Sequence, residues 1–211
     1  NYDTTLEIDL SKLMPDEKNT WIFYWASKGR DYLKTKYPPA EVAYGDFRNS
    51  GLAKLTNSQK AVFKFNNPKP YQVDDTAYPP HVHFVSLTKD KLWSPKLHTY
   101  LITPDINLDT FMKLLKSDLY LVINASPEAG NIPGTLPLSS NTQQHLINDK
   151  ILLALNDHLI NNYHKLTEIP IIIYCKNDKC NASTNLIKKL RQLGYINITT
   201  FKGGLDKYFG R

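Results

Sequence analysis

Apolar residues in the second half of the chain alternate between helical and strand-like patterns. They recur near helical spacing from Leu108 to Leu115, and the strand-like run Leu119–Ile123 follows. A loop over Asn124–Ser140 leads to a long helical pattern, which carries apolar residues along one side between Leu146 and Ile160. The β-branched run Ile171–Tyr174 is typical of a parallel strand that is buried on both faces.

The alternation continues after this strand. A polar loop precedes a predicted helix over Ser183–Leu193, whose end is marked by Gly194, and a last strand covers Ile196–Phe201. Gly203 and Gly204 then predict a turn with positive φ angles. Because strands alternate with helices, the sequence predicts an α/β fold in which helices cover both faces of a parallel sheet.

Short β-prone runs separated by turn residues fill the first half. All three Trp residues and most Tyr and Phe residues precede Asp105, and a short helix is predicted near Lys28–Lys34. The predicted strands cover Trp21–Trp25, Ala61–Phe65, Val82–Leu87 and His98–Ile102. We therefore predict a smaller β-rich or α+β domain over residues 1–104 and an α/β domain over residues 105–211, with the boundary around Pro104.

Composition and charge exclude several classes of protein. The charged fraction of 22% and the hydrophobic fraction of 41% are ordinary for a folded globular chain. No apolar run approaches the ~18 residues of a membrane-spanning helix, so no membrane span is expected. The net charge of +6 is spread over both halves, and the cluster Lys188, Lys189 and Arg191 fits the solvated face of a helix. Nucleic acid is therefore not an expected partner.

The chain has only two cysteines, Cys175 and Cys180, five residues apart. A secreted disulfide scaffold would carry more cysteines, so a reducing, cytoplasmic compartment is favoured. The chain begins at Asn1 rather than Met, which leaves a removed N-terminal targeting segment open. Reactivity is the favoured reason for keeping the two thiols.

Cys175 stands between a predicted buried strand and a predicted helix. Ligands of parallel α/β sheets bind beyond the carboxyl ends of the strands, where loop amides and a helix N-terminus favour anions. Lys176 and Lys179 add positive charge to the same loop. We therefore expect a pKa of the Cys175 thiol below the ~8.5 of a free cysteine. The alternative without chemistry is that Cys175 is only a small buried apolar side chain. Ser183 also fits the N-cap of the predicted helix.

The order of motifs in this half resembles the rhodanese family of sulfurtransferases. A buried strand ending in Tyr174-Cys175, a polar loop with a trailing Ser183, a helix, Leu193-Gly194-Tyr195, a strand and Gly203-Gly204 follow one another as in that family's active-site half. Upstream, Tyr120–Asn124 and Gly130-Asn131-Ile132-Pro133-Gly134 resemble its first strand and its Gly-His-Ile-Pro-Gly turn. The resemblance covers residues 105–211 and implies a rhodanese-like parallel sheet.

The resemblance also implies a chemistry. Cys175 would take a sulfur atom from a sulfane-sulfur donor, hold it as a persulfide, and pass it to a thiol acceptor, with no metal or organic cofactor. Cys180 would resolve the persulfide or form a regulatory disulfide with Cys175. The expected substrate-binding residues are those of the connecting loop: Lys176, Asn177, Asp178, Lys179, Asn181, Ala182 and Ser183.

Three departures from the family leave other functions open. Asn124 and Asn131 replace the Asp and His that are common in the family, and the loop from Cys175 to Ser183 is long and lacks the usual Gly and Arg pattern. A second hypothesis is therefore an inactive rhodanese-like scaffold that binds a protein partner through the aromatic first domain. A phosphatase or arsenate reductase ranks third, because no Arg in this loop can clamp an oxyanion.

Three histidines in the first half of the chain suggest a candidate metal site. His81-Val82-His83 places two imidazoles on one face of a predicted strand, and His98 could approach from a neighbouring strand to complete a zinc or iron site. Strand histidines without nearby acidic residues are more often exposed surface residues, and we favour that interpretation.

Overall fold

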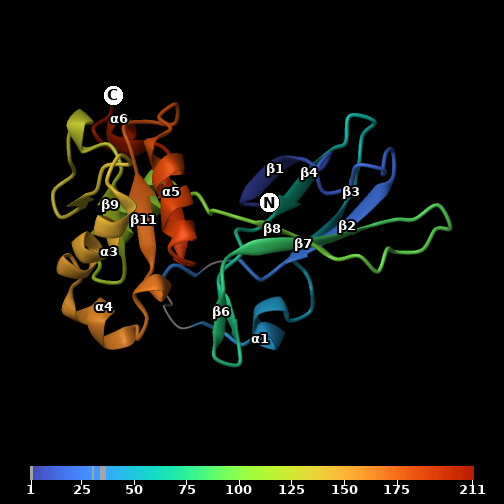
Figure 1. Ribbon diagram of the computed structural model, residues 1–211, viewed down its shortest axis with the longest axis horizontal. Coiled ribbons are helices and arrows are strands. Elements are labelled where there is room, and N and C mark those ends of the chain that lie inside the picture. Colours follow the sequence, from blue (N-terminus) through green and yellow to red (C-terminus); the bar gives the residue numbers. More distant parts are fainter. Residues whose placement is uncertain (1, 30, 34–36) are drawn as a thin grey trace. The chain divides into compact units, whose positions relative to one another are not determined.

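The computed structural model describes residues 2–29, 31–33 and 37–211. Its contacts divide the chain into two compact units. The first unit comprises the described residues of 1–31 and 36–102, and the second those of 32–35 and 103–211 (Figure 1). The chain is a mixed α/β protein with α- and 3₁₀-helices and several sheets.

The first unit is built from antiparallel strands and one short helix, α1 (Ala40–Tyr44). Its largest sheet has the strand order β3-β2-β7-β8, and two further pairs join β1 with β4 and β5 with β6. The strands are β1 (Thr4–Asp9), β2 (Trp21–Ala26), β3 (Ser50–Lys54), β4 (Lys60–Phe65), β5 (Tyr71–Val73), β6 (Thr76–Tyr78), β7 (His81–Ser86) and β8 (His98–Leu101).

The two faces of this sheet differ. Alternate residues of β2 and β7, such as Tyr24 and Phe84, join Phe63 of β4 in one buried core. The residues between them, such as Trp25 and His83, face the other way and lie 5.6 Å apart between ring centroids. This second face is rich in aromatic rings.

The second unit contains a parallel sheet of four strands in the order β10-β9-β11-β12. The strands are β10 (Leu136–Pro137), β9 (Leu121–Asn124), β11 (Ile171–Tyr174) and β12 (Ile198–Phe201). Every residue of β9, β11 and β12 is buried, and for β11 this confirms the burial predicted from its β-branched run.

Helices cover both faces of the parallel sheet. Ile171 and Ile173 pack into a cluster with residues of α3, α4 and α5, whereas Ile172 and Tyr174 pack into a second cluster with residues of α2 and α6. The helices are α2 (Leu108–Leu115), α3 (Gln144–Leu153), α4 (Asp157–Asn162), α5 (Ala182–Gln192) and α6 (Gly204–Tyr208), with 3₁₀ turns over Pro127–Ala129 and Leu166–Glu168.

Most of the predicted elements are confirmed within two residues, but the predicted long helix is wrong. The chain forms α3 and α4 instead, because Asn156 caps α4 by accepting a hydrogen bond from the Leu159 N–H at 2.9 Å. Ile147 and Ile151 are buried, while Leu146, Leu152 and Ile160 of the supposed apolar side are exposed.

Two local predictions also need correction. The helix expected near Lys28–Lys34 is not seen in its described residues, since Lys28, Gly29 and Asp31 are not helical and Tyr32 and Leu33 form a turn; residues 30 and 34 lie outside the described residues. Of the two glycines near the end, Gly204 has φ +59° but Gly203 has φ −57°, so only one position needs positive φ.

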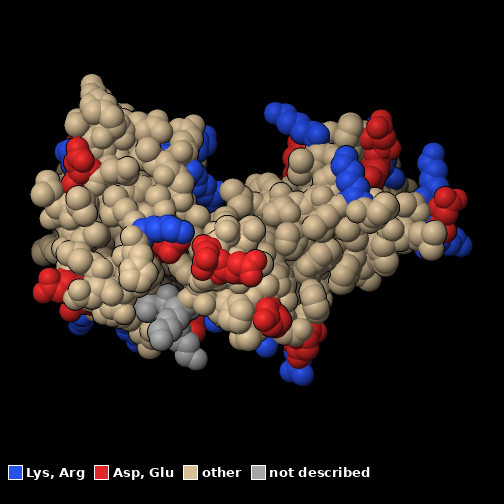
Figure 2. Space-filling view, turned by 60° about the horizontal axis from the view of Figure 1, so that its bottom comes forward, with Lys and Arg blue, Asp and Glu red and all other residues tan. Residues whose placement is uncertain are grey.

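The surface carries charges of both signs. Figure 2 shows acidic and basic side chains interspersed among uncharged ones on the face that it draws. Within the described part of the chain, each helix is too short or too polar to cross a membrane.

Candidate functional site

Cys175 follows directly on β11, the strand that lies between β9 and β12. The thiol is buried, with 2% of the residue exposed. Its Sγ lies 3.5 Å from the Ser183 hydroxyl oxygen. The structure therefore brings Cys175 and Ser183 together at the carboxyl end of a parallel strand, where ligands of such sheets bind.

Two backbone carbonyl groups also face the Cys175 thiol. Its Sγ lies 3.4 Å from the carbonyl oxygen of Asn177 and 3.4 Å from that of Cys180. Carbonyl oxygens only accept hydrogen bonds, so they stabilise the protonated thiol. Burial raises the pKa of Cys175, and hydrogen bonds with Ser183 oppose this only in part. The lowered pKa expected from the sequence is therefore wrong.

Cys180 is the more acidic thiol of the pair. Burial acts to raise its pKa, but hydrogen bonds with the backbone of Ala182, the Cys175 side chain and the backbone of Lys176 hold the pKa of Cys180 below its usual value. The side chain is partly exposed. Cys180 is therefore both easier to reach and easier to ionise than Cys175.

The rest of the predicted loop divides between structural and exposed positions. Asn177 folds the loop by accepting the Lys179 N–H at 3.2 Å, and its amide donates to Asp206 at 2.7 Å. Helix α5 begins at Ala182 with Asn181 as N-cap, so Ser183 is not the cap. The exposed positions of the loop are Lys176, Asp178, Lys179 and Asn181.

Helix α6 is hydrogen-bonded to the backbone that follows β11. The carbonyl oxygens of Cys175 and Lys176 accept hydrogen bonds, both 3.0 Å long, from the backbone N–H groups of Leu205 and Asp206. A Cβ atom at Gly204 would lie 2.2 Å from the Cys175 carbonyl oxygen. The glycine therefore allows α6 to approach the loop that follows β11.

An open pocket of about 450 Å³ adjoins the loop. It contains three of the predicted loop residues and four residues of the chain's end, which the sequence did not connect with the loop. The lining residues are Asn177, Asp178, Lys179, Gly203, Asp206, Lys207 and Arg211. Acidic and basic side chains are mixed here, and neither cysteine lines the pocket.

The two asparagines that depart from the family pattern have structural partners. Asn124 donates to the Gly130 carbonyl at 2.6 Å and to Asn131 Oδ1 at 2.9 Å. Tyr174 Oη accepts the Ile132 N–H at 3.0 Å and lies 2.8 Å from Thr135 Oγ1. The asparagines and Tyr174 thus hold the turn that follows β9.

Replacing Tyr174 with Phe is expected to lower the free energy of unfolding by about 1 to 3 kcal/mol, because the buried Ile132 N–H loses its acceptor. Denaturant unfolding measures the change. Tyr195→Phe is the matched control, since the Tyr195 hydroxyl donates to the exposed Asn148 side chain, which water can satisfy when the hydroxyl is removed. An effect of Tyr174→Phe no larger than that of the control would contradict this role.

The pKa directions predict an order of reactivity for the two thiols. Only the thiolate is alkylated, so a lowered pKa moves the rise in rate to lower pH and a raised pKa moves it to higher pH. Iodoacetamide should therefore modify Cys180 at a lower pH than Cys175. Residue-resolved mass spectrometry of the wild-type chain across a pH series measures both rates, and the reverse order would refute the assignment.

The histidines of the first unit do not form the three-histidine site considered from the sequence. His98 stacks on Phe84, with ring centroids 5.2 Å apart, and Phe84 belongs to the core on the opposite face from His83. Among the described residues, no group of three or more His, Cys, Asp and Glu side chains could hold a metal ion. The interpretation as exposed residues is also wrong, because His81 and His98 are 5% and 8% exposed.

His81 and His83 instead meet two tyrosines that sequence reasoning missed. His81 Nε2 lies 3.0 Å from His83 Nε2, 3.1 Å from Tyr44 Oη and 3.2 Å from Tyr71 Oη. The alternation of His81 and His83 along the strand was a usable signal, but Tyr44 and Tyr71 are distant in the chain and follow no motif. We call these four residues the His–Tyr cluster.

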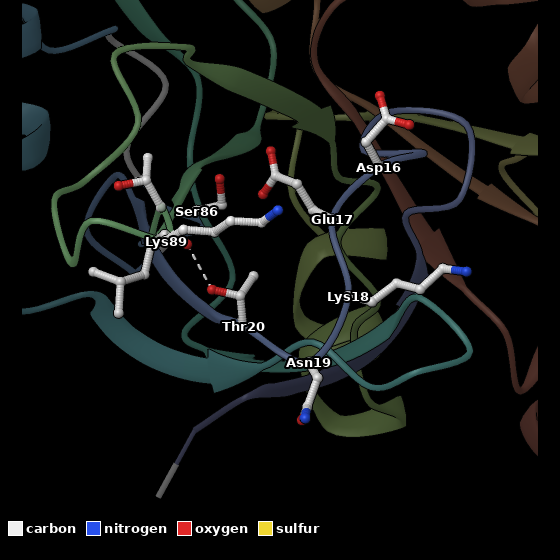
Figure 3. Close-up of a pocket in the computed structure, with 9 residues that line it drawn as sticks. Asp16, Glu17, Lys18, Asn19, Thr20, Ser86 and Lys89 are labelled. Atoms are coloured by element: carbon white, nitrogen blue, oxygen red, sulfur yellow. Dashed lines mark hydrogen bonds between the residues drawn. The ribbon is translucent and has the colours of Figure 1, made fainter.

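A second recess of about 430 Å³ lies at one end of the first unit (Figure 3). It is lined by Asp16–Thr20 and Ser86–Lys89, and the Lys89 side chain extends toward Glu17. Glu17 Oε2 is buried and has no hydrogen-bond partner among the described residues. The Thr20 hydroxyl donates a hydrogen bond to the Leu87 carbonyl at 2.6 Å, which links the two segments that line the recess.

Comparisons with known proteins show distant structural likeness only. No family model matches the chain, and no curated protein matches it. Among solved structures, the BH2092 protein from Bacillus halodurans is 22% identical, with a TM-score of 0.35, over 51% of this chain and 71% of that one. The T414V variant of EanB in complex with hercynine is 16% identical, with a TM-score of 0.36, over 52% of this chain and 26% of that one.

Proposed function

We propose that the second unit is a sulfurtransferase that carries sulfane sulfur on Cys175. The observation that carries the proposal is the place of this thiol: it follows a buried parallel strand directly and lies 3.5 Å from the Ser183 hydroxyl, in a loop that leads into α5. The carboxyl end of such a strand is where α/β sheets position their ligands. The rhodanese-like order of motifs in the sequence supports the same chemistry.

The proposed reaction proceeds in two displacements. The Cys175 thiolate attacks the outer sulfur of thiosulfate, the S–S bond breaks, and sulfite leaves with the bonding electrons. The persulfide on Cys175 is then attacked at its outer sulfur by an acceptor thiolate, and the Cys175 thiolate is released. Ser183 can donate a hydrogen bond to the anionic sulfur in both steps.

The exposure and the pKa of each thiol determine which cysteine meets the sulfur donor first. Cys175 is 2% exposed and its pKa is raised, so the donor must reach it after the loop opens or through Cys180. Cys180 is partly exposed and its pKa is lowered, which suits it to accept the incoming sulfur or to attack the persulfide on Cys175. Attack on the inner sulfur would release hydrosulfide and leave a Cys175–Cys180 disulfide, which an external thiol must reduce.

The second candidate function is a scaffold that binds a protein partner without chemistry. The same burial and raised pKa of Cys175 favour it, because both oppose a nucleophilic role. The two functions differ in whether sulfur is retained on the chain.

Intact mass spectrometry after thiosulfate treatment tests the proposal. We expect a gain of one sulfur atom that dithiothreitol removes. Cys175→Ser should abolish the gain if thiosulfate reacts at Cys175 directly, and should leave the sulfur on Cys180 if Cys180 accepts it first. Cys180→Ser should keep the gain if Cys180 only resolves the persulfide, and should slow it if Cys180 accepts the sulfur first. A wild-type chain that gains no sulfur from thiosulfate or from glutathione persulfide would leave the scaffold as the better function.

A further inference from the structure

The His–Tyr cluster lies on the face of the β3-β2-β7-β8 sheet that is turned away from the main core of the first unit. His81 and His83 are two residues apart on β7, so their side chains share this face. Tyr44 ends α1 and Tyr71 begins β5, and the two hydroxyl oxygens lie 3.3 Å apart. Three separate segments of the chain thus converge on one point.

The hydrogen bonds of the His81 ring leave its Nε2 atom as an electron-pair donor. His81 Nδ1 lies 2.7 Å from the Pro79 carbonyl oxygen, which can only accept, so Nδ1 carries the proton. His83 Nδ1 lies 2.9 Å from the Thr99 hydroxyl oxygen. Metal-binding histidines are usually held by a hydrogen bond at the ring nitrogen that does not bind the metal, because this bond orients the ring and exposes the other nitrogen.

Three polar groups converge on the single free lone pair of His81 Nε2. His83 Nε2, Tyr44 Oη and Tyr71 Oη all lie within 3.2 Å of this atom, and one ring lone pair can accept only one well-formed hydrogen bond. A cation bound at this point would be contacted by all four side chains.

The distances also suit one metal ion. His81 Nε2 lies 3.0 to 3.2 Å from the other three donor atoms, and the two phenol oxygens lie 3.3 Å apart. Separations of this length are those between ligand atoms that share one ion about 2 Å from each of them, which is the length of a metal–imidazole bond.

We propose that His81, His83, Tyr44 and Tyr71 form a mononuclear ferric iron site. Imidazole suits iron, copper, zinc and nickel, but phenolate is a hard anionic oxygen donor that favours the most highly charged of these ions. Two phenolates reduce the charge of Fe³⁺ to +1, which lowers the cost of holding the ion in a partly buried site. The site is separate from the cysteine loop and does not depend on the function proposed for it.

The surroundings of the four side chains fit a metal site. The Trp25 ring lies 5.6 Å from His83, Phe47 stacks on Tyr44 at 5.8 Å, and Tyr78 stacks on Tyr71 at 5.5 Å between centroids. These rings limit water around the donors and hold the tyrosines in place.

Iron loading tests the site directly. The full chain is freed of metal with a chelator, mixed with ferric nitrilotriacetate, desalted, and measured for iron content and visible absorption. We expect about one iron per chain and a visible phenolate-to-iron charge-transfer band. Tyr44→Phe and Tyr71→Phe should each shift or remove the band, and His83→Gln should weaken iron binding by at least about ten-fold.

Two matched variants serve as controls. Tyr100→Phe removes an exposed tyrosine of β8, and His145→Gln removes an exposed histidine of α3; both should keep the iron and the band. Circular dichroism establishes that each variant is folded, and the wild-type band stands as evidence even if a cluster variant does not fold. A colourless wild-type chain without iron, a band that survives both cluster tyrosine changes, or preferential retention of zinc or copper over ferric iron would each overturn the proposal.

Discussion

Replacing Gly204 with Ala is expected to lower the free energy of unfolding by about 2 to 4 kcal/mol, because two costs act together. The residue has φ +59°, which alanine adopts only with strain, and its Cβ would lie 2.2 Å from the Cys175 carbonyl oxygen. That oxygen belongs to the backbone and cannot rotate away. The expected shift of α6 would also break the hydrogen bond from Leu205 to Cys175 and increase alkylation of Cys175.

Gly134 provides the matched control for this substitution. Its φ is +79°, yet a Cβ there would meet no atom within 4 Å, so Gly134→Ala carries the conformational cost alone. Urea unfolding of the two variants should differ by the cost of the collision with Cys175, and only Gly204→Ala should change the alkylation rate. Equal losses of stability would show that the close approach of α6 to the loop is unimportant.

The second large effect is expected at Phe63, the centre of the aromatic core in the first unit. The side chain is fully buried, stacks on Tyr24 with centroids 4.4 Å apart, and meets Phe84 edge-on at 5.6 Å. Phe63→Ala should cost about 3 to 5 kcal/mol, since it removes a large apolar group and leaves a cavity. Tryptophan fluorescence reports the transition, because Trp21, Trp25 and Trp93 all precede residue 105.

Val62→Ala is the control on the same strand. Val62 alternates with Phe63 and is 43% exposed, so its truncation should change stability by no more than about 0.5 kcal/mol. Similar losses at the two positions would mean that the side chains of β4 do not face the directions described.

Sequence patterns predicted the elements whose burial is continuous or regularly periodic. Ile171–Tyr174 forms a strand because four successive large side chains are buried on both faces, and α2 forms where apolar residues share one helical face. β3 was missed because its segment contains Gly51, a weak strand former. The interruption between α3 and α4 was missed because a capping asparagine is equally common inside loops and helices.

The candidate sites, like the helices and strands, were predictable where they depend on local sequence and not where they depend on tertiary packing. The meeting of Cys175 with Ser183 follows from local order along the chain, and the sequence predicted it. The direction of the Cys175 pKa shift could not be predicted in this way, since it depends chiefly on how far the surrounding fold buries the sulfur. The convergence of Tyr44 and Tyr71 on His81 depends on how separate strands and α1 pack together, which no local pattern contains.

The two exposed lysines between the cysteines have a practical consequence. Trypsin cuts after Lys176 and Lys179, so it releases Cys175 in the peptide that ends at Lys176 and Cys180 in the peptide that ends at Lys188. Oxidation of the pair to a disulfide would join these two peptides into one branched species. A tryptic digest of protein isolated from cells under non-reducing conditions therefore measures the fraction of chains with a Cys175–Cys180 disulfide, without any assay of activity.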